Sequence, residues 1–281
     1  MKITNFEGRT AYITGGSSGI GLAIAKQLAS RGAGVIIFSR QADLLKSAIR
    51  EIENCRVSEG QRFSYMQVDV SQYEMTEKVL SNAVSEFGSP DILINSAGIA
   101  YPQKFEDTPY EKFDDILKVN LYGTWNTIHC LLPYLKQKKG YIVNTSSIAG
   151  FIGVFGMTSY SASKFAIIGF SEALRSELKS YGVTVSVLCP PDVDTPMLEK
   201  SNMIKPAEAK ALSSTADIMT PEAVASFLVK AMSREDFLLI PNVSGKFTHL
   251  LKRLLPGLTE RIIDSKIKSV QKNLKTANKK I

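Results

Sequence analysis

Cysteine, histidine and tryptophan are scarce in this 281-residue sequence, which has three cysteines, two histidines and one tryptophan. Cys55, Cys130 and Cys189 are odd in number and widely spaced, so they predict neither a disulfide framework nor a cluster of metal ligands. With only His129 and His249 beside them, we expect no metal site. Thiols that stay reduced indicate a cytoplasmic location.

Long apolar runs are also missing. No stretch reaches the roughly 18 apolar residues of a membrane-spanning helix. The first ten residues lead into an expected strand and contain no apolar signal region. Hydrophobic residues nevertheless make up 44% of the chain, enough for a sizeable core. We therefore expect a globular protein without a membrane span.

Positive charge is concentrated near the C-terminus. The net charge is +7, but residues 246–281 contain ten Lys/Arg and two acidic residues, which leaves about −1 for the rest. We expect a near-neutral domain over residues 1–242 and a basic amphipathic tail over 243–281. The tail's apolar pairs and cations suit a helix on an anionic membrane surface, or a helix packed on the domain with a solvated basic end. No nucleic-acid-reading motif is present, so no nucleic-acid partner is expected.

A glycine-rich turn follows the first β-rich run, residues 10–14, and precedes a helix-forming stretch. In this order, glycines let the backbone approach a pyrophosphate, and the helix N-terminus favours its negative charge. The pattern predicts a dinucleotide site. Its expected contacts are Gly15, Ser17, Ser18, Gly19 and Ile20, with Gly21 completing the turn.

The strand over residues 34–40 ends in Ser39 and Arg40, where an NAD-specific site would place an acid for the ribose diol. A guanidinium at this point suits a 2′-phosphate and favours NADP(H), although a solvated arginine at a strand end has the same sequence. Asp69 and Val70 end the next strand at the same edge. Asp69 is placed to meet the adenine amino group.

Two further segments carry residues expected near the cofactor. A strand from residue 91 ends in Asn95, Ala97 and Gly98, small residues that suit either a cofactor against the backbone or a tight turn. A long helix is expected over 109–137, but Asn120 and Gly123 have poor helical propensity within it. Such a departure from local preference indicates a kink or a functional group.

Tyr160 and Lys164 share one face of an expected helix. A tyrosine with its ordinary pKa near 10 is a poor base at neutral pH, and we expect the ammonium of Lys164 to lower that pKa toward the working range. Ser147 follows the strand over 140–146, so two hydroxyls can point at one oxygen. An ordinary amphipathic helix pair has the same four-residue spacing.

The last long β run, residues 183–189, leads into a loop with two prolines and two aspartates. Thr195 before Pro196 predicts a helix N-cap with proline at the first helical position. Residues of about 194–217, rich in Ala, Ser, Lys and Met, predict a mobile substrate lid. Seven strands alternating with helices predict an α/β fold, a doubly wound parallel sheet in a single domain with a helical tail.

These motifs, in order and register over residues 8–240, resemble the short-chain dehydrogenase/reductase superfamily. The resemblance implies a Rossmann fold and hydride transfer with NAD(P). It implies that Tyr160 is the acid/base, Lys164 binds the nicotinamide ribose, Ser147 holds the substrate oxygen and Asn120 orders a proton-relay water. A dimer or tetramer through the helices of Asn120 and Tyr160 is also expected. Pro190, Val193 and Thr195 complete the expected cofactor contacts.

Within the superfamily, the Pro190–Pro196 segment is similar to the 3-ketodihydrosphingosine reductases, which use NADPH to reduce the 3-keto group of a long-chain amino ketone. The expected function is therefore this step of sphingolipid synthesis, with Asp192 or Asp194 pairing with the substrate ammonium. Asp194 alternatively supports only the helix start at Thr195. Other hydrophobic ketones, such as 3-oxoacyl thioesters or steroids, remain alternative substrates, and a non-catalytic, membrane-associated NADPH-binding protein is a remote alternative.

Overall fold

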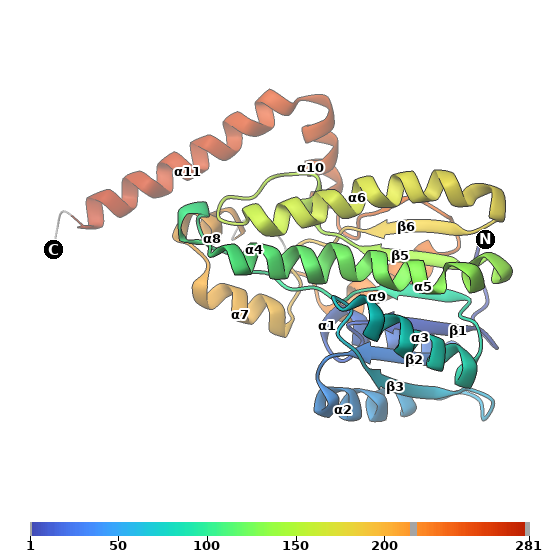
Figure 1. Ribbon diagram of the computed structural model, residues 1–281. Helices are drawn as coiled ribbons and strands as arrows, with labels where there is room; N and C mark the ends of the chain where they lie inside the picture. The colour runs from blue at the N-terminus through green and yellow to red at the C-terminus, as the bar shows by residue number, and fades with distance from the viewer. Residues whose placement is uncertain (1, 214–217, 279–281) are drawn as a thin grey trace.

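The computed structural model describes residues 2–213 and 218–278. A parallel sheet of seven strands, in the order β3-β2-β1-β4-β5-β6-β7, forms the centre of the molecule (Figure 1). The chain turns back at β1 and β4, which are neighbours, so the predicted doubly wound fold is confirmed. The strands are β1 (Thr10–Thr14), β2 (Gly34–Ser39), β3 (Phe63–Gln67), β4 (Ile92–Asn95), β5 (Tyr141–Thr145), β6 (Thr184–Leu188) and β7 (Leu238–Leu239).

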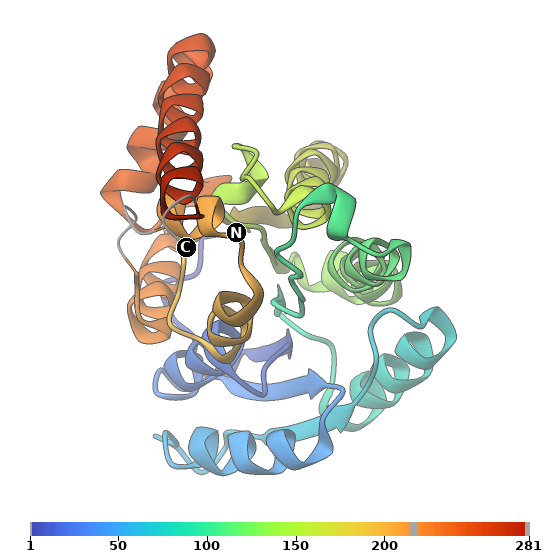
Figure 2. The same cartoon turned by 90° about the vertical axis from the view of Figure 1, so that its left-hand side faces the viewer.

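Helices cover both faces of the sheet (Figure 2). Ile13 and its neighbours on one face pack against α1 (Gly19–Ala29), α2 (Ala42–Glu53) and α9 (Pro221–Ala231). Tyr12 and its neighbours on the other face pack against α3 (Tyr73–Phe87), α5 (Gly123–Lys138) and α6 (Thr158–Leu178). Because both faces are buried, the central strands are almost continuously apolar, as parallel strands require.

The long helix expected over 109–137 is interrupted, as the sequence predicted. α4 (Tyr110–Leu117) leads through a π-helical turn over Lys118–Tyr122 into α5. Asn120 lies in this turn and is buried. A Cβ at Gly123 would lie 2.6 Å from Cγ2 of Val70, so glycine permits this helix to approach the end of the β3 segment.

The region predicted as a lid forms α7 (Pro196–Ile204) and α8 (Ala207–Ser213), and residues 214–217 of that prediction lie outside the described residues. The Thr195 hydroxyl accepts a hydrogen bond from the Leu198 N–H at 3.3 Å, which confirms the predicted N-cap. The tail forms α10 (Val243–Leu254) and α11 (Pro256–Asn278), and α11 runs back from α10 to α8 (Figure 1). Within 2–213 and 218–278, no helix is both long and apolar enough to cross a bilayer.

Candidate active site

The carboxyl ends of the strands open into a cavity of about 980 Å³, which is bordered on the far side by α7, α8, α10 and α11. Every predicted cofactor contact except Asn95 lines this cavity. Ser147, Tyr160, Lys164 and Asp192 line it as well. The fold therefore brings together residues from seven separate segments of the chain at one edge of the sheet.

The glycine-rich turn forms a backbone cradle at one end of the cavity. Gly15 has a φ of +68°, and a Cβ there would lie 2.7 Å from the Ala97 backbone nitrogen. Ser18 is the N-cap residue of α1, but its side chain makes no capping hydrogen bond. The first N–H groups of α1 are therefore left without a side-chain cap beside the cavity, which fits the pyrophosphate of a dinucleotide.

Arg40 extends from the end of β2 at the rim of the cavity. Its Nη1 lies 3.7 Å from Oδ2 of Asp69, and its side chain is 54% exposed. Asp69 also accepts hydrogen bonds from the backbone N–H and the hydroxyl of Ser71, at 3.0 and 2.7 Å. Because a guanidinium has five N–H donors, pairing with Asp69 leaves Arg40 donors for an anionic ligand. Asp69 thus forms a partly exposed ion pair with Arg40, which the sequence did not indicate.

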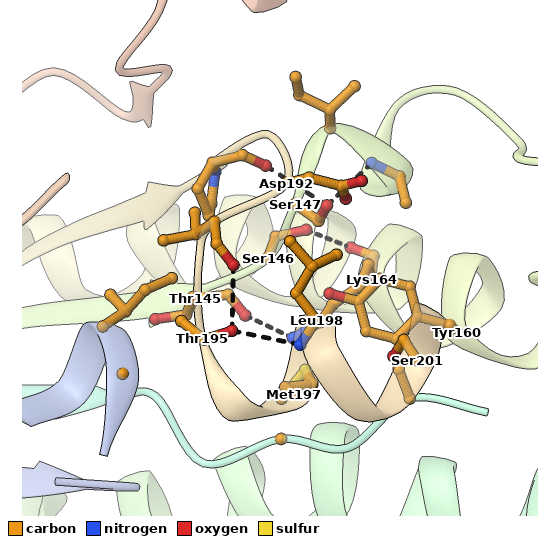
Figure 3. A pocket seen from close by; sticks show the side chains of 18 of the residues that line it. Thr145, Ser146, Ser147, Tyr160, Lys164, Asp192, Thr195, Met197, Leu198 and Ser201 are labelled. Atoms are coloured by element: carbon orange, nitrogen blue, oxygen red, sulfur yellow. Dashed lines mark hydrogen bonds between the residues drawn. The ribbon is translucent and has the colours of Figure 1, made fainter. Parts of the chain in front are cut away.

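Ser147, Tyr160 and Lys164 lie together in the middle of the cavity (Figure 3). Ser147 follows β5 in an extended conformation, and its hydroxyl donates to the Pro190 carbonyl at 3.4 Å and accepts from the Ala149 N–H at 3.2 Å. Lys164 is buried, and its Nζ donates a hydrogen bond to the Thr145 carbonyl at 2.8 Å. The same Nζ lies 5.5 Å from the centre of the Tyr160 ring. The two hydroxyls can both reach one oxygen of a bound molecule.

The predicted lowering of the Tyr160 pKa is wrong, because burial raises this pKa instead. Burial raises the pKa of Tyr160 to about 12, and the hydrogen bond from Ser147 opposes this only in part. Burial also lowers the pKa of Lys164 to about 8. In both cases, removing water disfavours the charged form. The phenol is therefore a protonated acid at neutral pH.

Asn95 and Asn120 are absent from the described lining of the cavity and act from behind it. The Asn120 side chain accepts from the Ile99 N–H at 2.8 Å and donates to the Ser163 hydroxyl at 3.0 Å. Asn95 donates to the Asn144 side chain at 2.9 Å, which joins β4 to β5. Both amides are satisfied by protein groups and fix the backbone beneath the cavity.

Asp192 lines the cavity, whereas Asp194 is exposed and lies outside its described lining. Oδ2 of Asp192 is 3.5 Å from Nζ of Lys205, whose side chain is only 3% exposed. Lys205 also donates to the Ser213 hydroxyl at 3.1 Å. This pairing was not predicted, because Lys205 is one of many lysines and lies directly after the end of α7.

Comparison with known proteins adds to this geometry. A family model described as short chain dehydrogenase matches residues 9–206 and so ends before α10 and α11. A 3-ketodihydrosphingosine reductase of Bos taurus is 39% identical over 232 residues, 82% of this chain and 70% of that protein. A D-beta-hydroxybutyrate dehydrogenase of Cupriavidus necator is 38% identical over 195 residues, 69% of this chain and 74% of that protein.

A solved structure has the same fold. The short chain dehydrogenase from Mycobacterium paratuberculosis bound to NAD superposes with a TM-score of 0.76 and is 27% identical. The match covers 86% of this chain and 99% of that one. The two chains therefore share the same overall fold.

Proposed function

Because the chain belongs to the short-chain dehydrogenases, a family of nicotinamide-dependent oxidoreductases, we propose that it uses NADPH to reduce 3-ketodihydrosphingosine or a closely similar long-chain amino ketone. The observation that carries this proposal is the chemistry of the cavity beside Tyr160. A carboxylate, Asp192, lies near the reacting hydroxyls, and apolar side chains of α7 and α10 lie beyond it. An amino ketone with an alkyl chain needs both features.

The cofactor preference rests on Arg40. A cation stands where NAD-specific relatives would place an acid, and it forms a partly exposed ion pair with Asp69 at the rim of the cavity. A charge-assisted hydrogen bond from this guanidinium would stabilise the 2′-phosphate of NADPH. Gly15, Ser18 and Gly19 would hold the pyrophosphate at the start of α1.

The proposed mechanism assigns proton transfer to Tyr160. The cofactor supplies the hydride when it is bound. Tyr160 Oη donates its proton to the carbonyl oxygen as negative charge develops there, and Ser147 Oγ donates a hydrogen bond to the same oxygen. Lys164, fixed by the Thr145 carbonyl, holds the cofactor ribose and its own charge near the phenol. Asn120 keeps the backbone at Ile99 in place through its hydrogen bond with the Ile99 N–H. We also propose that Asn120 orders a water that relays the proton.

We propose that Asp192 binds the substrate ammonium and that Asp194 only stabilises the loop before α7. Asp192 lines the cavity, and its carboxylate is already matched by Lys205 at 3.5 Å. The substrate ammonium would therefore share Asp192 with a resident cation. Another 3-keto compound is the second candidate substrate, because the D-beta-hydroxybutyrate dehydrogenase of Cupriavidus necator is 38% identical over 195 residues and is named for a substrate whose hydroxyl is on the β carbon.

Two surfaces complete the proposal. Tyr122, Trp125 and Phe165 are exposed at the start of α5 and on α6, where a second copy of the chain would cover them in a homo-oligomer.

The α10–α11 corner exposes leucines next to lysines and arginines, as a peripheral contact with an anionic membrane requires. Such an enzyme would work in the cytoplasm or on a membrane face.

The test is NADPH oxidation with 3-ketodihydrosphingosine in mixed micelles, run beside a 3-oxoacyl thioester. Turnover of the amino ketone, with NADH at least tenfold less efficient, is the expected result. Tyr160→Phe serves as the blank and should lose at least about 100-fold in kcat, because general acid catalysis contributes this much or more. Turnover of the thioester alone would reject the amino ketone while leaving the reductase chemistry in place.

A further inference from the structure

The helix α10 is fixed against the turn that carries Ser147. Asn242 caps α10 by accepting from the Gly245 N–H at 3.2 Å. A Cβ at Gly245 would lie 2.9 Å from Cδ1 of Ile148, the residue after Ser147, so glycine allows the close approach. One turn further, His249 packs edge-on against Phe151 with ring centres 4.9 Å apart. The first two turns of α10 therefore lie beside the catalytic hydroxyls.

The helix α11 connects α10 to the lid. Lys252 of α10 and Glu260 of α11 form an ion pair at 2.8 Å. Further along α11, Gln271 donates to Oε1 of Glu208 on α8 at 3.4 Å, and Lys104 lies 3.9 Å from the same carboxylate. Glu208 is buried. The α10–α11 pair thus runs from the catalytic turn to α8, as its course in Figure 1 shows.

The inner side of this helix pair continues the cavity away from Tyr160. The apolar lining residues that the tail contributes furthest along the chain are Leu251 of α10 and Ile262 and Ile263 of α11. Leu198 and Leu212 of the lid and Ile152 of the domain line the same cavity. An apolar path bounded by α10, α11 and the lid therefore starts at the reacting hydroxyls.

Building on the proposed function, we propose that the inner face of α10 and α11 binds the alkyl chain of the substrate and sets the preferred chain length. Each methylene moved from water into such a lining is worth about a fourfold gain in affinity. The ketone and ammonium would sit at Tyr160 and Asp192, with the chain extending toward Leu251 and Ile263. The two tail helices are then part of the substrate site.

The experiment measures kcat/KM for 3-keto amino substrates with chains of 10 to 18 carbons. Leu251→Trp and Ile263→Trp fill the proposed chain site, and Leu250→Trp on the outer face, where Leu250 is 53% exposed, is the matched control. For the wild type and the control, kcat/KM should rise with chain length. The two lining variants should lose at least tenfold on the 18-carbon substrate and stay within twofold on the 10-carbon one.

An unchanged chain-length profile in folded Leu251→Trp and Ile263→Trp, checked by circular dichroism, would overturn the proposal. If the wild type reduces no amino ketone, the proposed function fails, and the chain site is then tested by calorimetry with primary alkylamines of 6 to 12 carbons. Affinity that rises with length in the wild type and in Leu250→Trp, but not in Leu251→Trp, supports the chain site. Length-independent affinity in the wild type rejects it.

Discussion

Burial acts on Tyr160 and Lys164 in the same sense, because it favours the neutral form of each. The pKa of Tyr160 is raised to about 12 and that of Lys164 is lowered to about 8. Spacing along a helix indicates that two groups are neighbours, but the sign of a pKa shift depends on how much water the fold removes. This explains why the acid could be identified from the sequence while its pKa could not.

The pH dependence of the reaction follows from this shift. Ketone reduction needs protonated Tyr160 and charged Lys164, so kcat/KM for the ketone should stay flat from pH 6 to about 7.5 and fall above the Lys164 pKa of about 8. Alcohol oxidation needs the phenolate, which is scarce below a pKa of about 12, so its kcat/KM should rise about tenfold per pH unit over the same range. Steady-state rates in both directions, with Tyr160→Phe subtracted, provide the measurement. A reduction rate that halves near pH 7 would contradict the raised pKa.

The pairing of Asp192 with Lys205 gives a second prediction for single residues. Asp192→Asn should raise the KM for the amino ketone by about tenfold, because a charge-assisted hydrogen bond is lost, and leave a ketone without the amine unchanged. Lys205→Met removes the competing cation at similar volume and should lower the KM for the amino ketone. Equal effects of either variant on both ketones would show that Asp192 does not bind the ammonium.

Among the elements, those defined by local signals could be predicted from the sequence. The strand, glycine turn and helix at residues 10–29, and the Thr-Pro start of α7, depend on nearest neighbours and were predicted. The course of α11 could not be predicted, because its contact with Glu208 joins positions more than sixty residues apart. The Lys205–Asp192 pair was also missed, because only the folded lid brings these two side chains together.

The two Thr-Pro caps can be compared directly. Thr195 accepts from the Leu198 N–H and Thr220 accepts from the Ala223 N–H, at 3.3 and 3.2 Å. Thr195→Ala and Thr220→Ala should each lower the free energy of unfolding by about 1 kcal/mol. Only Thr195 lines the cavity, so only Thr195→Ala should raise the KM for NADPH. Thermal unfolding and cofactor titration of both variants test this, and a matching rise in KM for Thr220→Ala would contradict it.

At the scale of the whole molecule, the two expectations for the tail concern different faces of its helices. A helix packed on the domain and a helix on a membrane were both consistent with its composition. The structure packs one side of α10 and α11 on the domain and leaves Leu250, Leu254, Leu255 and Leu258 exposed on the other. Packing on the domain and contact with a bilayer therefore use different faces of the same helices, and one does not exclude the other.

The exposed face yields a prediction about membranes. A leucine moved from water into the acyl region contributes about 1.5–3 kcal/mol, and nearby cations add attraction to anionic headgroups. The wild type should sediment with phosphatidylglycerol-containing vesicles, and Leu250→Glu combined with Leu254→Glu should weaken this at least about tenfold. Val57→Glu, at a site 61% exposed on the opposite edge of the sheet, is the control and should bind like the wild type. If the double variant sediments as well as the control, α10 and α11 do not contact the bilayer. The substrate would then have to reach the chain site on their inner face from aqueous solution and not from the bilayer.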